Sequence, residues 1–207
     1  MTSPLLWYLN RGTGIVLVVV FTLTVVLGVL ATGRSVTPWW PRFVTQGLHR
    51  GLAAVSVLLL AAHAVLAVVD EFVDIRWWQA VVPFGATYQP FWLALGTVAL
   101  DLTAVVVATS LARTRLPHRL WFLVHLTTYG AWAAGVVHGF GIGTDSRVGW
   151  SLVITVACVG AVALAALARV VAVLVGRSRS GRTGGSGGRG GRAAAHARQL
   201  VPDGGAR

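Results

Sequence analysis

The stretch from Gln46 to Asp70 is an apolar run of membrane-spanning length that carries two histidines, His49 and His63, fourteen residues apart. A second apolar run carries His125 and His138, thirteen residues apart. A helix rises about 1.5 Å per residue, so these spacings separate the two imidazoles of each helix by about 21 Å and roughly 19.5 Å. In a hydrocarbon core about 30 Å thick, each helix therefore places one imidazole near each leaflet.

The rotation of each helix decides which side its histidines face. At about 100° per residue, His63 returns to within roughly 40° of His49, so both lie on one face. The same rotation leaves roughly 140° between His125 and His138. We therefore expect the second helix either to be distorted or to present its two histidines on different sides.

Histidine is rare inside membrane helices, where it usually faces the bundle interior and marks a functional site. A single histidine can equally be a hydrogen-bonded packing residue, but four at two matched heights favour a common role. Imidazole is a frequent axial ligand of haem iron. We expect His49 with His125 to hold an inner haem and His63 with His138 an outer haem, stacked across the bilayer.

The composition indicates a polytopic membrane protein, because 56% of the residues are hydrophobic. The predicted fold is an all-α bundle of five transmembrane helices in a domain covering 1–175, at a cell membrane. Cys158 is the only cysteine and lies within an apolar run, so it is interpreted as a packing residue and no disulfide framework is expected. The five predicted spans are about 12–32, 46–69, 90–112, 118–139 and 149–175.

All seventeen basic residues are arginines, and the formal net charge is +11. Their clustering at span ends is explained by membrane orientation rather than by nucleic-acid binding. Of the sixteen at span ends, in connections or in the tail, thirteen lie on one side (Arg34, Arg42, Arg50, Arg113, Arg115, Arg119, Arg177, Arg179, Arg182, Arg189, Arg192, Arg198, Arg207) and three on the other (Arg11, Arg76, Arg147). This asymmetry predicts an external N-terminus and a cytoplasmic C-terminus.

The segment 176–207 consists mainly of Gly, Arg and Ser with little apolar mass, which predicts a disordered cytoplasmic tail. Its arginines would favour contact with anionic membrane lipids by about 1 kcal/mol each near the surface. The Gly-rich stretch 181–191 follows no predicted strand and opens no predicted helix. It is therefore interpreted as a linker and not as a dinucleotide-binding fingerprint.

Several charged residues near the histidines have two possible roles. Arg50 follows His49 directly and is a candidate partner for an inner-haem propionate. Arg119 on the inner side, and Arg76 and Arg147 on the outer side, are either propionate partners or orientation charges among the lipid headgroups.

Two further residues within or next to the spans are candidates. His118 lies seven residues before His125, so it either competes as an inner ligand or is an interfacial residue after Pro117. Asp101 lies in the middle of the third span, where a bare carboxylate would cost about 2.5 kcal/mol or more. It is expected to be neutral or paired inside the bundle, and it is a candidate for proton handling.

Four acidic residues fall in the predicted external loops. Their carboxylates could gather a hard cation such as ferric iron, but a solvated charged loop is the simpler interpretation. They are Asp70, Glu71, Asp74 and Asp145.

The histidines occur within longer motifs. These are HR-x12-H at His49, Arg50 and His63, and W-x3-H-x3-Y-x8-HG at Trp121, His125, Tyr129, His138 and Gly139. With these motifs the chain resembles the ferric reductase-like transmembrane domain superfamily, which includes the membrane parts of ferric reductases and NADPH oxidases. The resemblance covers roughly 43–150, or up to 175 with the last span.

The resemblance implies two b-type haems that carry electrons from a cytosolic reduced flavin to an external acceptor, with the four histidines as ligands. The chain differs from larger members in having five spans and no flavin or nicotinamide domain after the last one. It is therefore expected to be the haem subunit of an oxidoreductase, fed by a cytosolic flavoprotein reductase or by membrane quinol. The alternatives are a quinone-linked haem subunit of an external oxidoreductase, and a non-redox transporter with histidines as proton relays.

Overall fold

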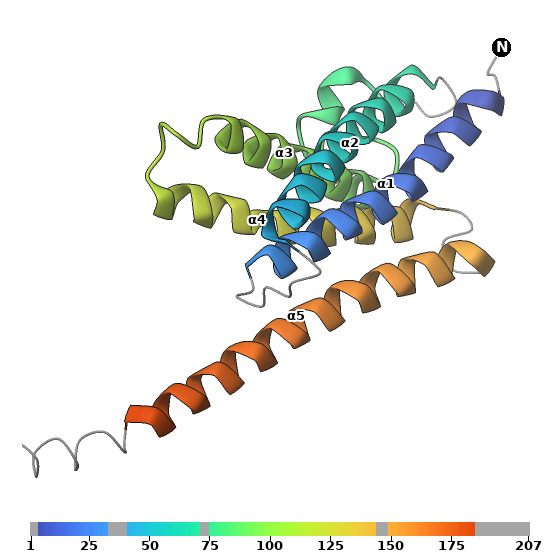
Figure 1. Cartoon of the computed structure of the whole chain (residues 1–207). Helices are drawn as coiled ribbons and strands as arrows, with labels where there is room; N and C mark the ends of the chain where they lie inside the picture. The colour runs from blue at the N-terminus through green and yellow to red at the C-terminus, as the bar shows by residue number, and fades with distance from the viewer. Residues whose placement is uncertain (1–3, 33–40, 71–74, 144–148, 185–207) are drawn as a thin grey trace, which may run out of the picture. The chain divides into compact units, whose positions relative to one another are not determined.

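Five long helices make up most of the computed structural model, which describes residues 4–32, 41–70, 75–143 and 149–184 (Figure 1). Within these ranges all regular secondary structure is helical, and all five long helices have the length and apolar composition to cross a membrane. The predicted all-α polytopic bundle is thus confirmed. The elements are α1 (Pro4–Ala31), α2 (Arg42–Val69), the short 3₁₀ helix η1 (Trp77–Ala80), α3 (Pro90–Leu111), α4 (His118–Ile142) and α5 (Gly149–Gly184).

Two helices are longer than the sequence pattern predicts. The first span was expected from about residue 12, but α1 begins at Pro4, a residue suited to a first helical turn. Arg11 does not end the apolar helix, because its guanidinium lies 5.5 Å above the ring of Trp7, one turn earlier. The last span was expected over 149–175, and the candidate membrane span in α5 covers Gly149–Val175, although the helix itself continues to Gly184. The remainder of the predicted tail, 185–207, lies outside the described residues.

Prolines set where three helices begin. Pro41 and Pro117 stand in extended conformation just before α2 and α4, and Pro90 occupies the first turn of α3. Their fixed φ suits a helix start, and the missing N–H is one that a first turn leaves unpaired in any case. The helices therefore begin where the sequence pattern predicts a break between spans.

The helices pack mainly as two pairs, α1 with α2 and α3 with α4, and α1 also contacts α4. Small residues meet between α3 and α4, where Gly135 lies next to the buried Ala99. Small residues allow helix backbones to approach closely, which is the main source of attraction between helices in lipid. By its contacts the chain divides into the units Met1–Ala165 and Ala166–Arg207, and the pairs α1–α2 and α3–α4 belong to the first.

Polar side chains join the helix pairs. Trp132 of α4 donates its indole N–H to the hydroxyl of Thr22 on α1 at 2.9 Å. The hydroxyls of Thr24 on α1 and Ser56 on α2 lie 3.3 Å apart, and both residues are buried. In an apolar medium such groups need partners, so these bonds fix the position of α1 against α2 and α4.

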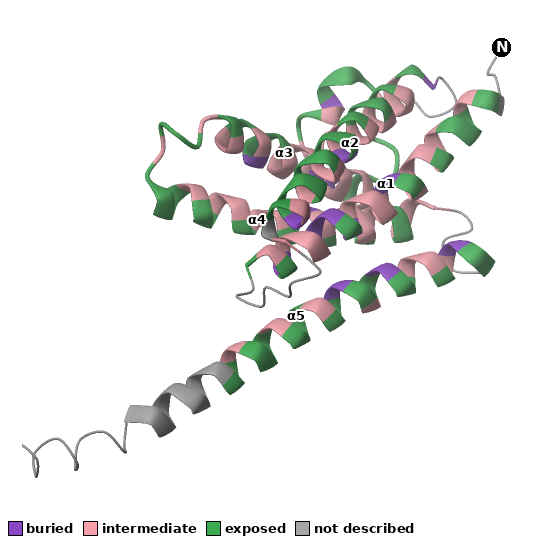
Figure 2. Ribbon diagram, viewed as in Figure 1, coloured by how far each residue is buried: buried purple, intermediate pink, exposed green. Residues whose placement is uncertain are grey.

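Exposed residues recur along all five long helices (Figure 2), and many of them have large apolar side chains. Phe43 is 73% exposed, Leu58 71% and Leu111 82%. In water this exposure would oppose folding, but in a bilayer these side chains meet lipid tails. The exposed apolar surface therefore agrees with the membrane location that the composition predicts.

The bond between Trp132 and Thr22 gives a first prediction. Thr22→Val and Trp132→Phe should each lower the thermal stability of the detergent-solubilised protein, and Thr22→Ser should not, because serine keeps the hydroxyl. Interhelical hydrogen bonds of this kind are worth about 0.6 kcal/mol on average. A double-mutant cycle on Thr22→Val and Trp132→Phe should return a coupling of that order, and fully additive losses would show that the bond contributes nothing.

Candidate functional site

The four histidines of α2 and α4 form two facing pairs. The ring centroids of His49 and His125 lie 6.3 Å apart with their planes at 63°. The ring centroids of His63 and His138 lie 6.4 Å apart with their planes at 82°. These are the pairs expected from the heights of the histidines along their helices.

The separation of the rings suits a metal ion between them. Metal–imidazole bonds are about 2.0 Å long, and a ring nitrogen lies about 1.1 Å from the ring centroid. Two imidazoles on opposite sides of one iron therefore have centroids about 6.3 Å apart. Both observed distances match this value, so the four residues fit axial ligation of two haem irons.

The number of candidate protein ligands at each level, two imidazoles, also suits a haem iron. Across the described parts of the chain, no three His, Cys, Asp or Glu side chains gather to hold a metal ion. A zinc site of the usual kind takes three or four protein ligands, whereas haem iron takes at most two because the porphyrin supplies the rest. Two imidazoles at each level therefore fit the protein ligands of a haem better than those of a zinc site.

Three of the four rings are held by backbone carbonyls of neighbouring helices. The Nδ1 atom of His63 lies 3.1 Å from the carbonyl oxygen of Asn10, and that of His49 lies 2.9 Å from the carbonyl oxygen of Thr24. The Nδ1 atom of His138 lies 2.8 Å from the carbonyl oxygen of Trp92. A carbonyl can only accept, so Nδ1 carries the proton and Nε2 keeps the lone pair that a metal needs.

His125 is held differently from the other three. Its ring stacks on that of Trp121, one turn earlier in α4, with centroids 5.1 Å apart and planes at 24°. Its Nδ1 and the indole nitrogen of Trp121 are buried without a hydrogen-bond partner among the described residues.

The two histidines of α4 have different surroundings, although the helix runs without a break from His118 to Ile142. His138 contacts a carbonyl of α3, while His125 lies against Trp121.

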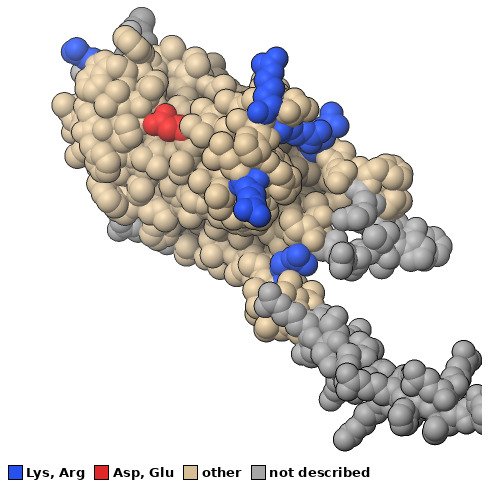
Figure 3. All heavy atoms as spheres, turned by 90° about the vertical axis from the view of Figure 1, so that its left-hand side faces the viewer, with Lys and Arg blue, Asp and Glu red and all other residues tan. Residues whose placement is uncertain are grey.

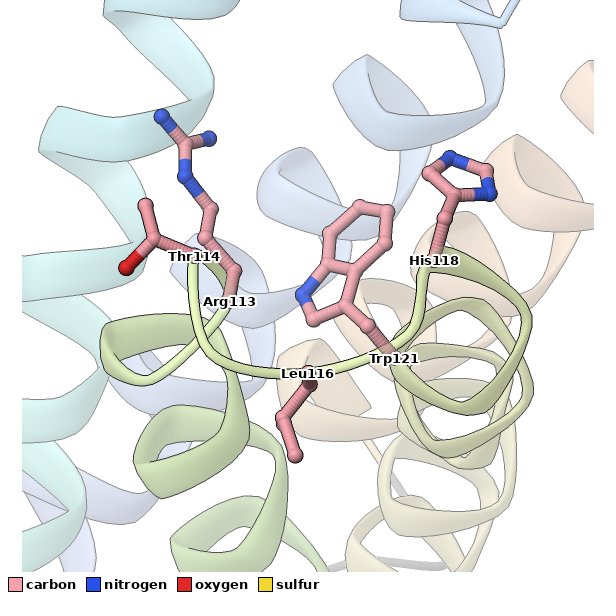
Figure 4. A pocket seen from close by; sticks show the side chains of 5 residues that line it. All are labelled: Arg113, Thr114, Leu116, His118 and Trp121. Atoms are coloured by element: carbon pink, nitrogen blue, oxygen red, sulfur yellow. The ribbon is translucent and has the colours of Figure 1, made fainter.

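A pocket of about 280 Å³ lies at the connection between α3 and α4, next to the inner pair (Figure 4). In Figure 4 the indole of Trp121 lies between Arg113 and His118. The ring of His118 lies 5.7 Å from that of Trp121, so a row of aromatic rings leads from the pocket to His125 and then to His49. The lining residues are Arg113, Thr114, Leu116, His118 and Trp121.

Among the other candidates, His118 is exposed and stacks on Phe122 with centroids 6.4 Å apart. It is His125, and not His118, that faces His49. Asp101 is half-buried in the middle of α3. The acidic loop residues are placed only in part: Asp70 is buried at the end of α2, and the rest lie outside the described residues, namely Glu71, Asp74 and Asp145.

The described arginines are unevenly distributed over the two ends of the helices. Arg50, Arg113, Arg115 and Arg119 are exposed at the end that carries the inner pair, while Arg76 is exposed near the outer end. Figure 3 shows basic side chains standing out on a largely uncharged face of the molecule. None of these described arginines contacts a histidine of the two pairs, so their role as propionate partners stays a prediction. Arg147 lies outside the described residues.

Sequence reasoning missed the contribution of α1 and of the start of α3. Asn10, Thr24 and Trp92 act through their backbone carbonyls, which no side-chain motif reveals. The sequence contains one indication of these partners: Asn10 and Thr24 are fourteen residues apart, the same spacing as that between His49 and His63.

A comparison with models of known protein families gives a match over most of the helical bundle. The family model described as "Ferric reductase like transmembrane component" matches residues 13–136, which is more than half of the chain and includes His49, His63 and His125. No curated protein matches the chain.

The arrangement of His118 and His125 gives a second prediction. His118→Ala should leave the haem content of the purified protein unchanged, because its ring stands at the rim of the pocket and not opposite His49. His125→Ala should remove about half of the haem, because it leaves one pair with a single imidazole. Haem per chain measured as pyridine haemochrome checks both variants, and a loss in His118→Ala equal to that in His125→Ala would make His118 a ligand.

Proposed function

Because the chain belongs to the ferric reductase-like transmembrane component family, we propose that it carries electrons across a cell membrane through two b-type haems. His49 and His125 would hold the inner haem, and His63 and His138 the outer. The family match supports transmembrane electron transfer in general, and the two imidazole pairs support the number and positions of the haems.

The observation that carries this proposal is the pair of matching gaps, 6.3 Å and 6.4 Å between ring centroids, at two levels of the same helices. A haem iron bound between two imidazoles exchanges single electrons and has no open position for a substrate. The protein's own part is to hold the four rings at the two levels, to accept hydrogen bonds from Nδ1–H of three of them, and to keep the surroundings apolar.

We propose that the inner end faces the cytoplasm. More arginines lie at that end than at the outer end, as the positive-inside rule requires of a cytoplasmic side. The pocket between Arg113 and His118 opens beside the inner pair, and its rings continue to His125. Electrons would therefore enter at this end from a cytosolic flavoprotein or from membrane quinol, and leave to an external acceptor.

A quinone-linked role is the second candidate, and the same pocket favours it. Leu116 and Trp121 offer apolar surface, while Thr114, Arg113 and His118 offer polar groups, which is a combination that suits a quinol ring at the membrane surface. In this second candidate the chain is the haem subunit of an external oxidoreductase and exchanges electrons with membrane quinone through the same two haems.

The outer pair gives a third prediction. His63→Ala and His138→Ala should each lower the haem content from about two to about one per chain and leave the inner haem in place, because each iron takes one ligand from each helix. The spectrum and potential of the remaining haem should be the same in both variants. Loss of both haems from a stably folded variant would contradict pairing by height.

The electron donor gives a fourth prediction. Nicotinamides deliver hydride whereas haem iron takes one electron, so a flavin must normally act between them. The purified protein should be reduced by dithionite but stay oxidised with NADPH or NADH, and a flavin reductase should restore the transfer. Reduction by a quinol analogue alone would favour the quinone-linked candidate, and rapid reduction by NADPH without flavin would contradict the prediction.

A further inference from the structure

Three glycines stand at equivalent places beside the hydrogen-bonded histidines. Each lies four residues after the carbonyl that a histidine ring contacts: Gly14 after Asn10, Gly28 after Thr24, and Gly96 after Trp92. The same arrangement thus occurs at both levels of the bundle and on two different helices.

At each glycine a histidine ring occupies the space of a side chain. A Cβ atom at Gly14 would lie 3.1 Å from Cε1 of His63, and one at Gly28 would lie 3.3 Å from Cε1 of His49. A Cβ atom at Gly96 would lie 2.7 Å from both Cε1 and Nδ1 of His138. Any larger residue would push the ring away from its carbonyl, most strongly at Gly96.

Helix geometry explains the spacing of four residues. The carbonyl of residue i accepts the N–H of residue i+4, and the Cβ of residue i+4 tilts back toward the helix N-terminus, over that carbonyl. Without this Cβ, the second lone pair of the oxygen is open to a donor from a neighbouring helix. Glycine inside a helix is otherwise destabilising relative to alanine, so its presence calls for a reason of this kind.

Other glycines in the helices can be compared with these three for the space that a Cβ atom would have. A Cβ at Gly130 or Gly135 of α4 would meet only one side-chain carbon, at 3.9 Å, and a Cβ at Gly12 of α1 would meet nothing within 4 Å. Among the described glycines, close approach to a histidine ring is therefore confined to those that follow the bonded carbonyls, whereas Gly141 of α4 lies against the ring of Trp92.

We propose that Gly14, Gly28 and Gly96 are positioning residues, which let three histidines donate Nδ1–H to helix carbonyls and so turn Nε2 toward the haem irons. This inference rests on the proposed function and assigns α1 a part in it, the placing of one ligand of each haem. The fourth ligand, His125, is placed by Trp121 instead.

The test compares Gly14→Ala, Gly28→Ala and Gly96→Ala with Gly12→Ala and Gly130→Ala in the full-length protein. Haem retention and the reduction potential of each haem are measured by redox titration, without any assay of turnover. Gly28→Ala should weaken only the inner haem, and Gly14→Ala and Gly96→Ala only the outer. Losing an outer-shell partner typically costs about tenfold to a hundredfold in metal affinity, and the affected potential should rise because the imidazole becomes less basic. The two control variants should behave like the wild type.

Unchanged retention and potentials in all three variants would overturn the proposal, as would an equal effect on both haems from each variant. If Gly96→Ala does not fold, Gly28→Ala still carries the test, because its Cβ has the most room. Nitrogen NMR of ¹⁵N-histidine-labelled wild-type protein in the reduced state provides a check that needs no variant. The Nδ1 resonances of His49, His63 and His138 are expected to show the shift of a hydrogen-bonded N–H when compared with that of His125, and no difference from His125 would overturn the proposal. A wild-type protein that binds no haem would contradict the proposed function instead.

Discussion

An imidazole inside a bilayer must find partners for both of its nitrogens, because the hydrocarbon core offers no water to replace a missing hydrogen bond. In three of the four histidines a helix carbonyl takes the Nδ1 proton, at 2.8 to 3.1 Å. Only the Nε2 lone pair is then left to satisfy. A metal ion between the facing rings would do so at both levels, and the proposed haems would then contribute to the packing of the bundle.

This requirement also explains why the helices pair as they do. The carbonyls that hold His49 and His63 come from α1, and the one that holds His138 comes from α3, so α1 packs against α2 and α3 against α4. The indole of Trp132 then ties α4 to α1 through Thr22. The two ligand-bearing helices are thereby held at a fixed separation.

The sequence predicted the helices and the histidine pairs because both depend on regular spacing. Apolar length determines the number of spans, and the rise per residue gives the height of each histidine. It did not predict the start of α1, because Arg11 resembled a boundary until its contact with Trp7 was seen. Nor did it predict the carbonyl partners, since any residue supplies a carbonyl and only the packing of helices shows which one is reached.

The central claim is that each facing pair binds one haem between its imidazoles, and electron paramagnetic resonance of the oxidised protein tests it most directly. The ring planes cross at 63° and 82°. Crossed axial planes leave two iron d orbitals nearly equal in energy and give low-spin signals with a large principal g value, unlike the rhombic signals of parallel planes. The account predicts two such low-spin signals of equal intensity. High-spin haem alone, or no haem signal from protein expressed with ample haem, would contradict it and favour histidines that act as proton relays.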